Sequence, residues 1–225
     1  MDWLSRWTDA DLARWEQRPF SPSVEGGPRP HDNQDKHERV IGQEAPGLPE
    51  ADGSARRLAG AILRFDVFPP TLLTSVKRRT PVEVGDTLGL RYPFLPGIDL
   101  FFAARVIDRF EKVVGNQWCN GFTYRTLAGH PECGEETFIV EKDLTTGKVT
   151  AALRSWSRAG LWIARLAYPM VRHMQLHAAG AALDHLQCLA MRNDTPARSS
   201  IQGSTEASLS RRNLRTGLLR SAERW

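Results

Sequence analysis

The amino-acid sequence predicts an α+β fold in which a curved antiparallel sheet is covered by a long C-terminal helix. Between residues 87 and 156, apolar residues form short runs or alternate with polar ones, which is typical of strands. A helical stripe of apolar residues follows over 159–189. Because an apolar sheet face is unstable in water, we expect this helix to pack across the sheet and close the core.

The N-terminal third of the chain predicts three helices and one strand. Residues 1–20 place large apolar side chains at roughly helical intervals until a proline ends the pattern. Frequent glycine and proline in 21–36 predict a linker, and 37–43 predict a first strand. Ser54 is a candidate N-cap for the next helix, and a short third helix is expected over 71–76.

Five strands are predicted in the middle of the chain. They cover residues 87–92, 98–110, 117–126, 135–142 and 148–156. Residues 143–147 end in Thr-Gly between the last two strands, and this composition predicts a hairpin turn.

The long C-terminal helix is predicted from spacing and contains one proline. Its apolar stripe consists of Ile163, Leu166, Met170, Met174, Ala178, Ala182, Leu186 and Leu189. Pro169 lacks a backbone donor and clashes with the preceding turn, so we expect it to kink or split the helix.

The sequence predicts one domain between two terminal segments. We predict an N-terminal helix and linker (1–36), a single α+β domain (37–190) and a disordered basic tail (191–225). The tail contains seven arginines and three acidic residues, a net charge of +4, which equals the formal net charge of the whole chain. The folded domain is therefore neutral overall, and we expect no nucleic-acid partner for it.

Several classes of protein are disfavoured by what the sequence lacks. No stretch reaches the roughly eighteen apolar residues of a transmembrane helix, and the first residues do not resemble a secretory signal. The three cysteines form no CxxC pair, so we expect a soluble, reduced, cytoplasmic protein. Nucleotide-binding glycine loops and the HExxH motif do not occur, and no cofactor is predicted.

The centre of the chain resembles a known family. Residues 124–138 read Tyr-Arg-Thr-Leu-Ala-Gly-His-Pro-Glu-Cys-Gly-Glu-Glu-Thr-Phe, and Ser155-Trp156-Ser157-Arg158 and Gln175 follow. This run resembles the family called domain of unknown function nineteen-ninety (the UPF zero-five-four-eight group), from about Trp15 to Leu189. Ala159 stands where the family often has proline. The resemblance implies one defined domain and brings no established reaction.

The order of elements also resembles the helix-grip architecture of START and Bet v 1-like proteins. In that architecture a curved antiparallel sheet and a long terminal helix often enclose a cavity. By this analogy we expect a small hydrophobic or amphipathic molecule to bind between sheet and helix.

Chemistry is expected in the segment that contains His130, Glu132, Cys133, Glu135 and Glu136. One hypothesis is acid–base catalysis, with His130 as base, Glu132 or Glu135 as its partner, and Tyr124 or Arg125 holding a developing anion. A second is a metal site, although no second His or Cys pair at ligand spacing is present, and we predict no metal. A third is a structural turn in which proline and glycine fix the backbone and His130 binds a main-chain group.

Ligand-binding residues are predicted on the strands and on the helix. Arg154 and Trp156 share one face of their strand, whereas Ser155 and Ser157 share the other. An arginine facing a cavity needs a carboxylate or an anionic ligand; the alternative is an ion pair at the rim. The predicted ligand-binding residues are Tyr124, Arg125, Arg154, Trp156, Arg158 and Met174.

The leading hypothesis is therefore a protein that binds a small, mostly apolar molecule between sheet and helix. One alternative is an enzyme that performs acid–base chemistry on such a molecule. Another is an interaction protein that uses its basic tail.

Overall fold

A computed structural model describes residues 2–4, 9–24, 26–160 and 168–191. The predicted tail beyond Met191, and residues 161–167 of the predicted long helix, lie outside the described residues. The described elements belong to one compact unit, Met1–Asn193. No helix in the described ranges is long and apolar enough to cross a lipid bilayer.

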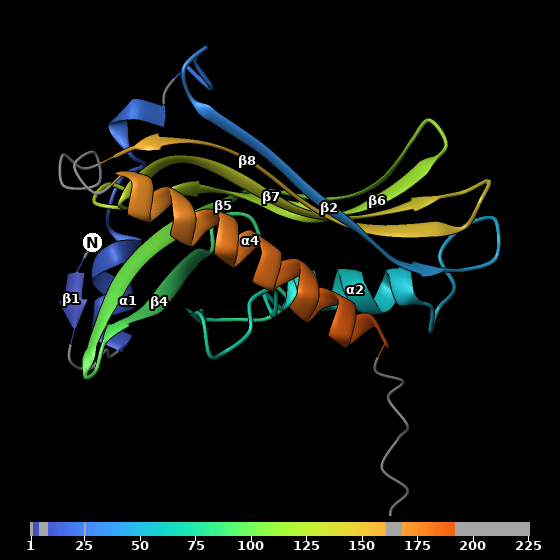
Figure 1. Ribbon diagram of the computed structural model, residues 1–225, viewed down its shortest axis with the longest axis horizontal. Coiled ribbons are helices and arrows are strands. Elements are labelled where there is room, and N and C mark those ends of the chain that lie inside the picture. The colour runs from blue at the N-terminus through green and yellow to red at the C-terminus, as the bar shows by residue number, and fades with distance from the viewer. Residues whose placement is uncertain (1, 5–8, 25, 161–167, 192–225) are drawn as a thin grey trace, which may run out of the picture. The chain divides into compact units, whose positions relative to one another are not determined.

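In the described part of the chain, eight strands form one antiparallel sheet (Figure 1). The strand order is β2-β8-β7-β6-β5-β4-β3, and β1 pairs with β5. The strands are β1 (Asp2–Leu4), β2 (Asn33–Gln43), β3 (Thr74–Val76), β4 (Thr87–Leu95), β5 (Ile98–Val114), β6 (Gln117–Thr126), β7 (Glu132–Asp143) and β8 (Lys148–Ala159). Strand β2 therefore pairs with β8, the last strand in the chain, although more than 100 residues separate them.

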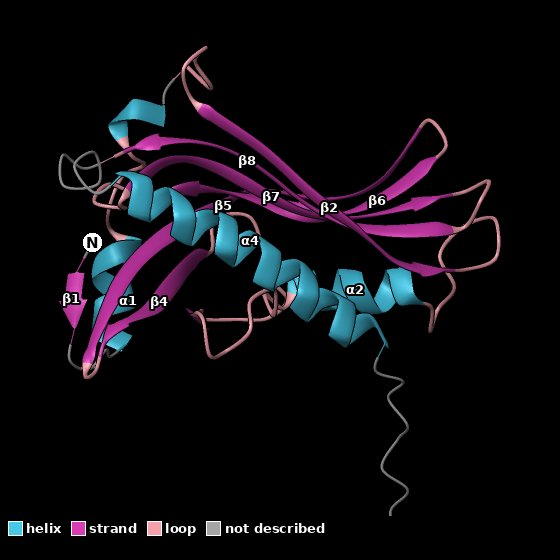
Figure 2. Ribbon diagram, in the orientation of Figure 1, coloured by secondary structure: helices cyan, strands magenta, loops and turns pink. Residues whose placement is uncertain are grey.

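The helices are α1 (Asp9–Glu16), η1 (Pro22–Val24), α2 (Ser54–Leu63) and α4 (Tyr168–Met191). Figure 2 shows α4 running across the curved strands, with α2 beside its C-terminal end. The predicted α+β helix-grip arrangement is confirmed.

The main core lies between the concave face of the sheet, α2 and α4. Alternate residues of β6 and β7, including Phe122, Tyr124 and Phe138, point into it because side chains alternate along a strand. The rings of Phe122, Tyr124 and Phe138 surround Phe65, which follows α2, with centroid distances of 5.6–6.3 Å. A smaller apolar cluster, formed by α1 and the opposite face of the sheet, includes Leu12, Trp15 and Phe101.

Two predicted helices near the N-terminal end differ in the structure. The helix expected over 71–76 is wrong: Thr74–Val76 form β3, which pairs with β4 at the edge of the sheet. Two of its three residues are β-branched and Val76 is buried, so pairing and burial outweigh a single isolated helical turn. The helix expected over 1–20 is limited to Asp9–Glu16, and Asp2–Leu4 pair with β5 instead.

Two further boundaries bear on the candidate site. Strand β7 begins at Glu132 rather than at residue 135, because the turn after β6 is completed by Gly129 and His130. α4 is described from Tyr168, so Pro169 lies in its first turn, and the residues on the other side of the kink or split expected there lie outside the described residues. The N–H that proline lacks has no helical partner at that position.

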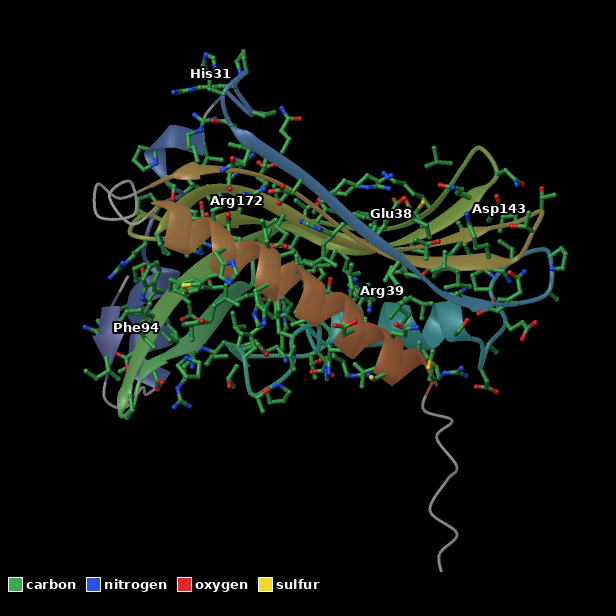
Figure 3. All side chains as sticks on the ribbon, in the orientation of Figure 1. His31, Glu38, Arg39, Phe94, Asp143 and Arg172 are labelled. Carbon is green, nitrogen blue, oxygen red and sulfur yellow. The ribbon has the colours of Figure 1, made fainter. Side chains whose placement is uncertain are left out.

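Polar contacts attach α4 to the β2 and β8 side of the sheet. Both terminal nitrogens of Arg172 donate to the Asp35 carboxylate of β2 at 2.5 Å. Gln175 donates to the Ser157 hydroxyl of β8 at 3.4 Å. Figure 3 shows Arg172 where the N-terminal half of α4 meets the sheet. These contacts hold the N-terminal half of α4 against β2 and β8.

Candidate functional site

A cavity of about 320 Å³ lies between the concave face of the sheet and α4. Most of its wall is apolar, and the apolar lining residues are Phe68, Leu73, Leu90, Phe94, Leu100, Phe102, Leu153, Met174, Leu176, Ala178 and Ala179. This volume is at the small end of the range for small-molecule sites.

Carboxyl groups gather at one end of the cavity. Glu132 and Glu136 line it from the same face of β7, because they are four positions apart and side chains alternate along a strand. Gly134 lies between them, and a Cβ at that position would lie 2.0 Å from the backbone oxygen of Trp156 in β8. The close pairing of β7 and β8 therefore requires glycine and leaves no side chain between the two glutamates.

Glu136 is bound by the residue directly opposite it on β6. The two strands pair Tyr124 with Glu136, and the Tyr124 hydroxyl donates to Glu136 Oε2 at 2.5 Å. Burial raises the pKa of Glu136 to about 7, although the hydrogen bond from Tyr124 opposes this shift. Burial and the nearby Glu136 carboxylate also raise the pKa of the Tyr124 hydroxyl well above its usual value.

Glu132 is in a similar environment nearer the end of the strand. Burial raises the pKa of Glu132 to about 7, and a hydrogen bond from Gln175 of α4 opposes the shift. Two carboxyl groups that change charge near neutral pH thus face one small cavity. Groups tuned in this way suit proton transfer or the binding of a charged ligand.

Asp35 and Arg172 form an ion pair at the same end of the cavity. The hydrogen bond from Arg172 lowers the pKa of Asp35, so this aspartate remains ionised when the two glutamates are protonated. The pair joins β2 to α4 and belongs to the cavity wall.

His130 lies in the turn before β7 and is 7% exposed. Its Nδ1 lies 2.9 Å from the backbone oxygen and 3.0 Å from the backbone nitrogen of Glu132, so the main chain satisfies it in either neutral tautomer. Its ring packs edge-on against Phe102 at 4.7 Å. Burial lowers the pKa of His130 to about 3, so the imidazole is neutral near pH 7.

The structure separates the predicted site residues into three groups. Tyr124, His130, Glu132 and Met174 line the cavity. Arg125, Arg154 and Arg158 do not, because their side chains lie on the opposite face of the sheet.

Each arginine in the second group has an acidic partner. Arg125 binds Glu135, Arg154 binds Glu141 at 2.5 Å, and Arg158 binds Asp32 at 2.6 Å. Of the two alternatives for these arginines, the arrangement matches the ion pairs rather than a cavity site.

Glu135 and Trp156 border the cavity, but their polar atoms are already bound to other groups. Glu135 accepts from Arg125 Nε at 2.7 Å and from Trp156 Nε1 at 3.3 Å. The structure thus assigns Glu135 to a contact with Arg125 and does not place it beside His130 as a proton-transfer partner.

Three of the charged residues that line the cavity were not among the predicted site residues. Glu136 has a sequence signal, since it lies two strand periods after Glu132, but the signal appears only when β7 begins at Glu132. Asp35 and Arg172 lie 137 positions apart, and no sequence pattern connects them. Among the residues that the structure describes, no three His, Cys, Asp or Glu side chains are grouped closely enough to hold a metal ion.

Comparison with known sequences identifies relatives of this chain. A family model described as "Domain of unknown function (DUF1990)" matches residues 23–185. A UPF0548 protein from Dictyostelium discoideum is 31% identical over 108 residues, which cover 44% of this chain and 48% of that protein. The chain therefore spans about half the length of the curated relative it matches.

Solved structures show distant likenesses to the fold. A hypothetical protein, jhp0584 from Helicobacter pylori, has a TM-score of 0.46 at 13% identity, over 84% of this chain and 97% of that one. Ginseng major latex-like protein 151 from Panax ginseng has a TM-score of 0.42 at 12% identity, over 72% and 99%. Norcoclaurine synthase from Thalictrum flavum has a TM-score of 0.39 at 12% identity, over 70% and 86%.

Proposed function

The chain belongs to the DUF1990 family, and we propose that it binds a small, mostly apolar molecule between its sheet and α4. The observation that carries this proposal is the cavity of about 320 Å³, with an apolar wall and hydrogen-bonding groups gathered at one end. A molecule with a hydrocarbon body and one polar group matches this distribution.

Apolar burial supplies a sufficient driving force. A ligand that removes about 200 Å² of apolar surface from water gains about 5 kcal/mol before the entropy of association is subtracted. The polar end then determines which head group is accepted, because buried polar groups left unpaired oppose binding.

The test combines co-purification with variants that fill the cavity. Native mass spectrometry of the purified full chain, followed by denaturing extraction, is expected to show a small molecule in stoichiometric amount. Met174→Trp and Ala179→Phe enlarge side chains that line the cavity and are expected to abolish the bound mass. His177→Trp enlarges an exposed residue of the same helix and is expected to retain it.

The outcome that contradicts the proposal is equally concrete. If the bound mass persists in both cavity-filling variants while they remain folded by circular dichroism, the molecule binds elsewhere. If the wild-type chain carries no molecule and takes up none from a cell extract, the cavity is not a binding site.

The raised pKa values of Glu132 and Glu136 favour a second candidate, acid–base chemistry on the bound molecule. Side chains with a pKa near 7 exchange protons most effectively at neutral pH. In this version the two glutamates transfer protons, and the neutral His130 acts as a hydrogen-bonding group rather than as the base. Glutamate carboxyl resonances that titrate near pH 4.5 in carbon NMR would remove the basis for this candidate.

A further inference from the structure

We propose that the polar head of the bound molecule is a protonated amine, held by Glu132, Glu136 and the Nε2 atom of His130. This inference rests on the proposed function, because it assigns a chemical class to the molecule in the same cavity. It follows from the charges at the polar end and from one unpaired nitrogen.

The charges at the polar end are not balanced. Four acidic residues, Asp35, Glu132, Glu135 and Glu136, line the cavity, and Glu135 is paired with Arg125 on the other face of the sheet. Arg172 is the sole arginine or lysine among the described lining residues. Both terminal nitrogens of Arg172 are bound to Asp35. Arg172 acts on Glu132 only through its charge, and among the described residues neither glutamate forms an ion pair with a lysine or arginine. A cation in the ligand would supply that partner.

His130 provides an independent observation. The residue is 93% buried and lines the cavity. Its Nε2 atom is buried and has no hydrogen-bond partner in the described structure, and a buried polar atom without a partner is costly. Because the main chain satisfies Nδ1, Nε2 is the ring nitrogen that has no hydrogen-bond partner. In the tautomer that donates from Nδ1 to the Glu132 carbonyl, Nε2 accepts a hydrogen bond from an ammonium group.

These three acceptors belong to residues that line the same cavity, and Arg172, the arginine among its described lining residues, is bound to Asp35. An ammonium group has three N–H donors, and the two carboxyl groups and Nε2 match them in number. An anionic head group would instead add a charge beside three carboxyl groups, with an arginine that is already fully engaged. The arrangement therefore favours an amine over an acid with the same hydrocarbon.

Binding should depend on pH in one direction. The remaining titratable and charged groups that line the cavity are His37 and Asp35 on β2, Tyr92 on β4, Tyr124 on β6, His130 before β7, Glu135 on β7, which is paired with Arg125, and Arg172 on α4. Glu132 and Glu136 lose their protons as the pH rises through about 7, while a primary alkylamine stays protonated. Amine affinity is therefore expected to increase between about pH 6 and pH 8.

The experiment uses three probes with one hydrocarbon: naphthylmethylamine, naphthylmethanol and naphthoic acid. Each is titrated into the full wild-type chain by calorimetry near neutral pH. We expect the amine to bind at least about tenfold more tightly than the alcohol, and the acid to bind most weakly. Calorimetry of the amine in buffers of different ionisation enthalpy is expected to show proton release below about pH 7.

Isosteric variants connect the preference to the two glutamates. In Glu132→Gln combined with Glu136→Gln, the amine preference is expected to fall to about threefold or less, while alcohol binding is retained. Glu38→Gln changes an exposed glutamate of β2 that pairs with Lys36, away from the cavity lining, and is expected to keep the full preference (Figure 3).

The outcomes separate this inference from the proposed function. Equal binding of amine and alcohol, tighter binding of the acid, or a preference that survives in the double variant would overturn the amine assignment and leave the cavity as a binding site. If none of the three probes binds to the wild-type chain, the amine assignment fails, and the co-purification experiment decides whether the cavity is a binding site at all.

Discussion

The Tyr124 hydroxyl donates a hydrogen bond of 2.5 Å to Glu136, which lies directly opposite it on the neighbouring strand, and both residues line the cavity. The hydrogen bond stabilises the ionised carboxylate in a site where burial favours the neutral acid. The charge of the polar end near neutral pH therefore depends on this contact.

We expect Tyr124→Phe to raise the pKa of Glu136 further above 7, because the variant removes the hydrogen bond and leaves the burial. Carbon NMR of labelled glutamate carboxyls measures the shift. Tyr92→Phe removes a hydroxyl from another lining residue on β4 and serves as the control. A lower or unchanged Glu136 pKa in Tyr124→Phe would contradict the assigned role of the hydroxyl.

Stability is expected to fall as the pH rises through neutrality. The pKa values of Glu132 and Glu136 are raised from 4.5 to about 7, so the folded state binds protons more tightly than the unfolded state. This contribution is complete below about pH 4.5 and is lost as the pH rises through about 7.

Glu136→Gln removes the ionisation and keeps an acceptor for Tyr124. We expect this variant to be more stable than the wild type at about pH 8, by up to about 3 kcal/mol, with little difference at about pH 5. Urea unfolding at the two pH values measures it. A variant that gains nothing at the higher pH would show that Glu136 has an ordinary pKa.

His130 is expected to remain neutral throughout the physiological range. Burial lowers its pKa to about 3, and a lowered histidine pKa contributes stability above about pH 6.5 that is lost as the pH falls toward 3. In histidine-selective NMR, its ring resonances should not shift between about pH 5 and pH 8. Titration of His130 near pH 6.5 would contradict its burial.

Gly134→Ala is expected to destabilise the fold by about 1–3 kcal/mol, because its Cβ would overlap the Trp156 carbonyl oxygen of β8. Gly180→Ala is the matched control, since nothing lies within 4 Å of its Cβ position on α4. This helical substitution should instead stabilise the protein by up to about 1 kcal/mol. Chemical unfolding of both variants makes the comparison, and equal stability would contradict the close strand pairing.

The Asp35–Arg172 pair is expected to contribute to stability more than an exposed pair on the same strand. A double-mutant cycle with Asp35→Asn and Arg172→Gln should give a coupling energy of about 0.5–3 kcal/mol, because both side chains are less than a quarter exposed. The Lys36–Glu38 pair, whose side chains are at least half exposed, should give a smaller coupling energy because water screens it. Similar values for the two cycles would show that α4 is not held by Asp35.

Most strands could be predicted from the sequence, because their signal is local. The prediction for residues 117–126 coincides with β6, and β8 begins where it was expected, at Lys148. The prediction failed at 71–76, where pairing with β4 decides the structure of three residues. The family resemblance was also correct, because the run from Tyr124 to Phe138 is long and specific.

The candidate site was only partly predictable. His130, Glu132, Tyr124 and Met174 line the cavity, but the predicted arginines lie on the opposite face of the sheet. Glu136 illustrates the difficulty. Glu132 shares its face of the strand only because β7 begins three residues earlier than predicted. The roles of all these residues in binding stay predictions.

By itself, the sequence determined the alternation of apolar and polar residues in the strands, the apolar stripe of the C-terminal helix and the motif that identifies the family. These features are local, so periodicity and residue type are enough to define them. Only the tertiary structure decided that β2 returns to pair with β8, that Arg172 meets Asp35, and that two glutamates share a small apolar cavity. Burial and the charges of neighbouring groups set a pKa, and both depend on contacts between residues far apart in the chain.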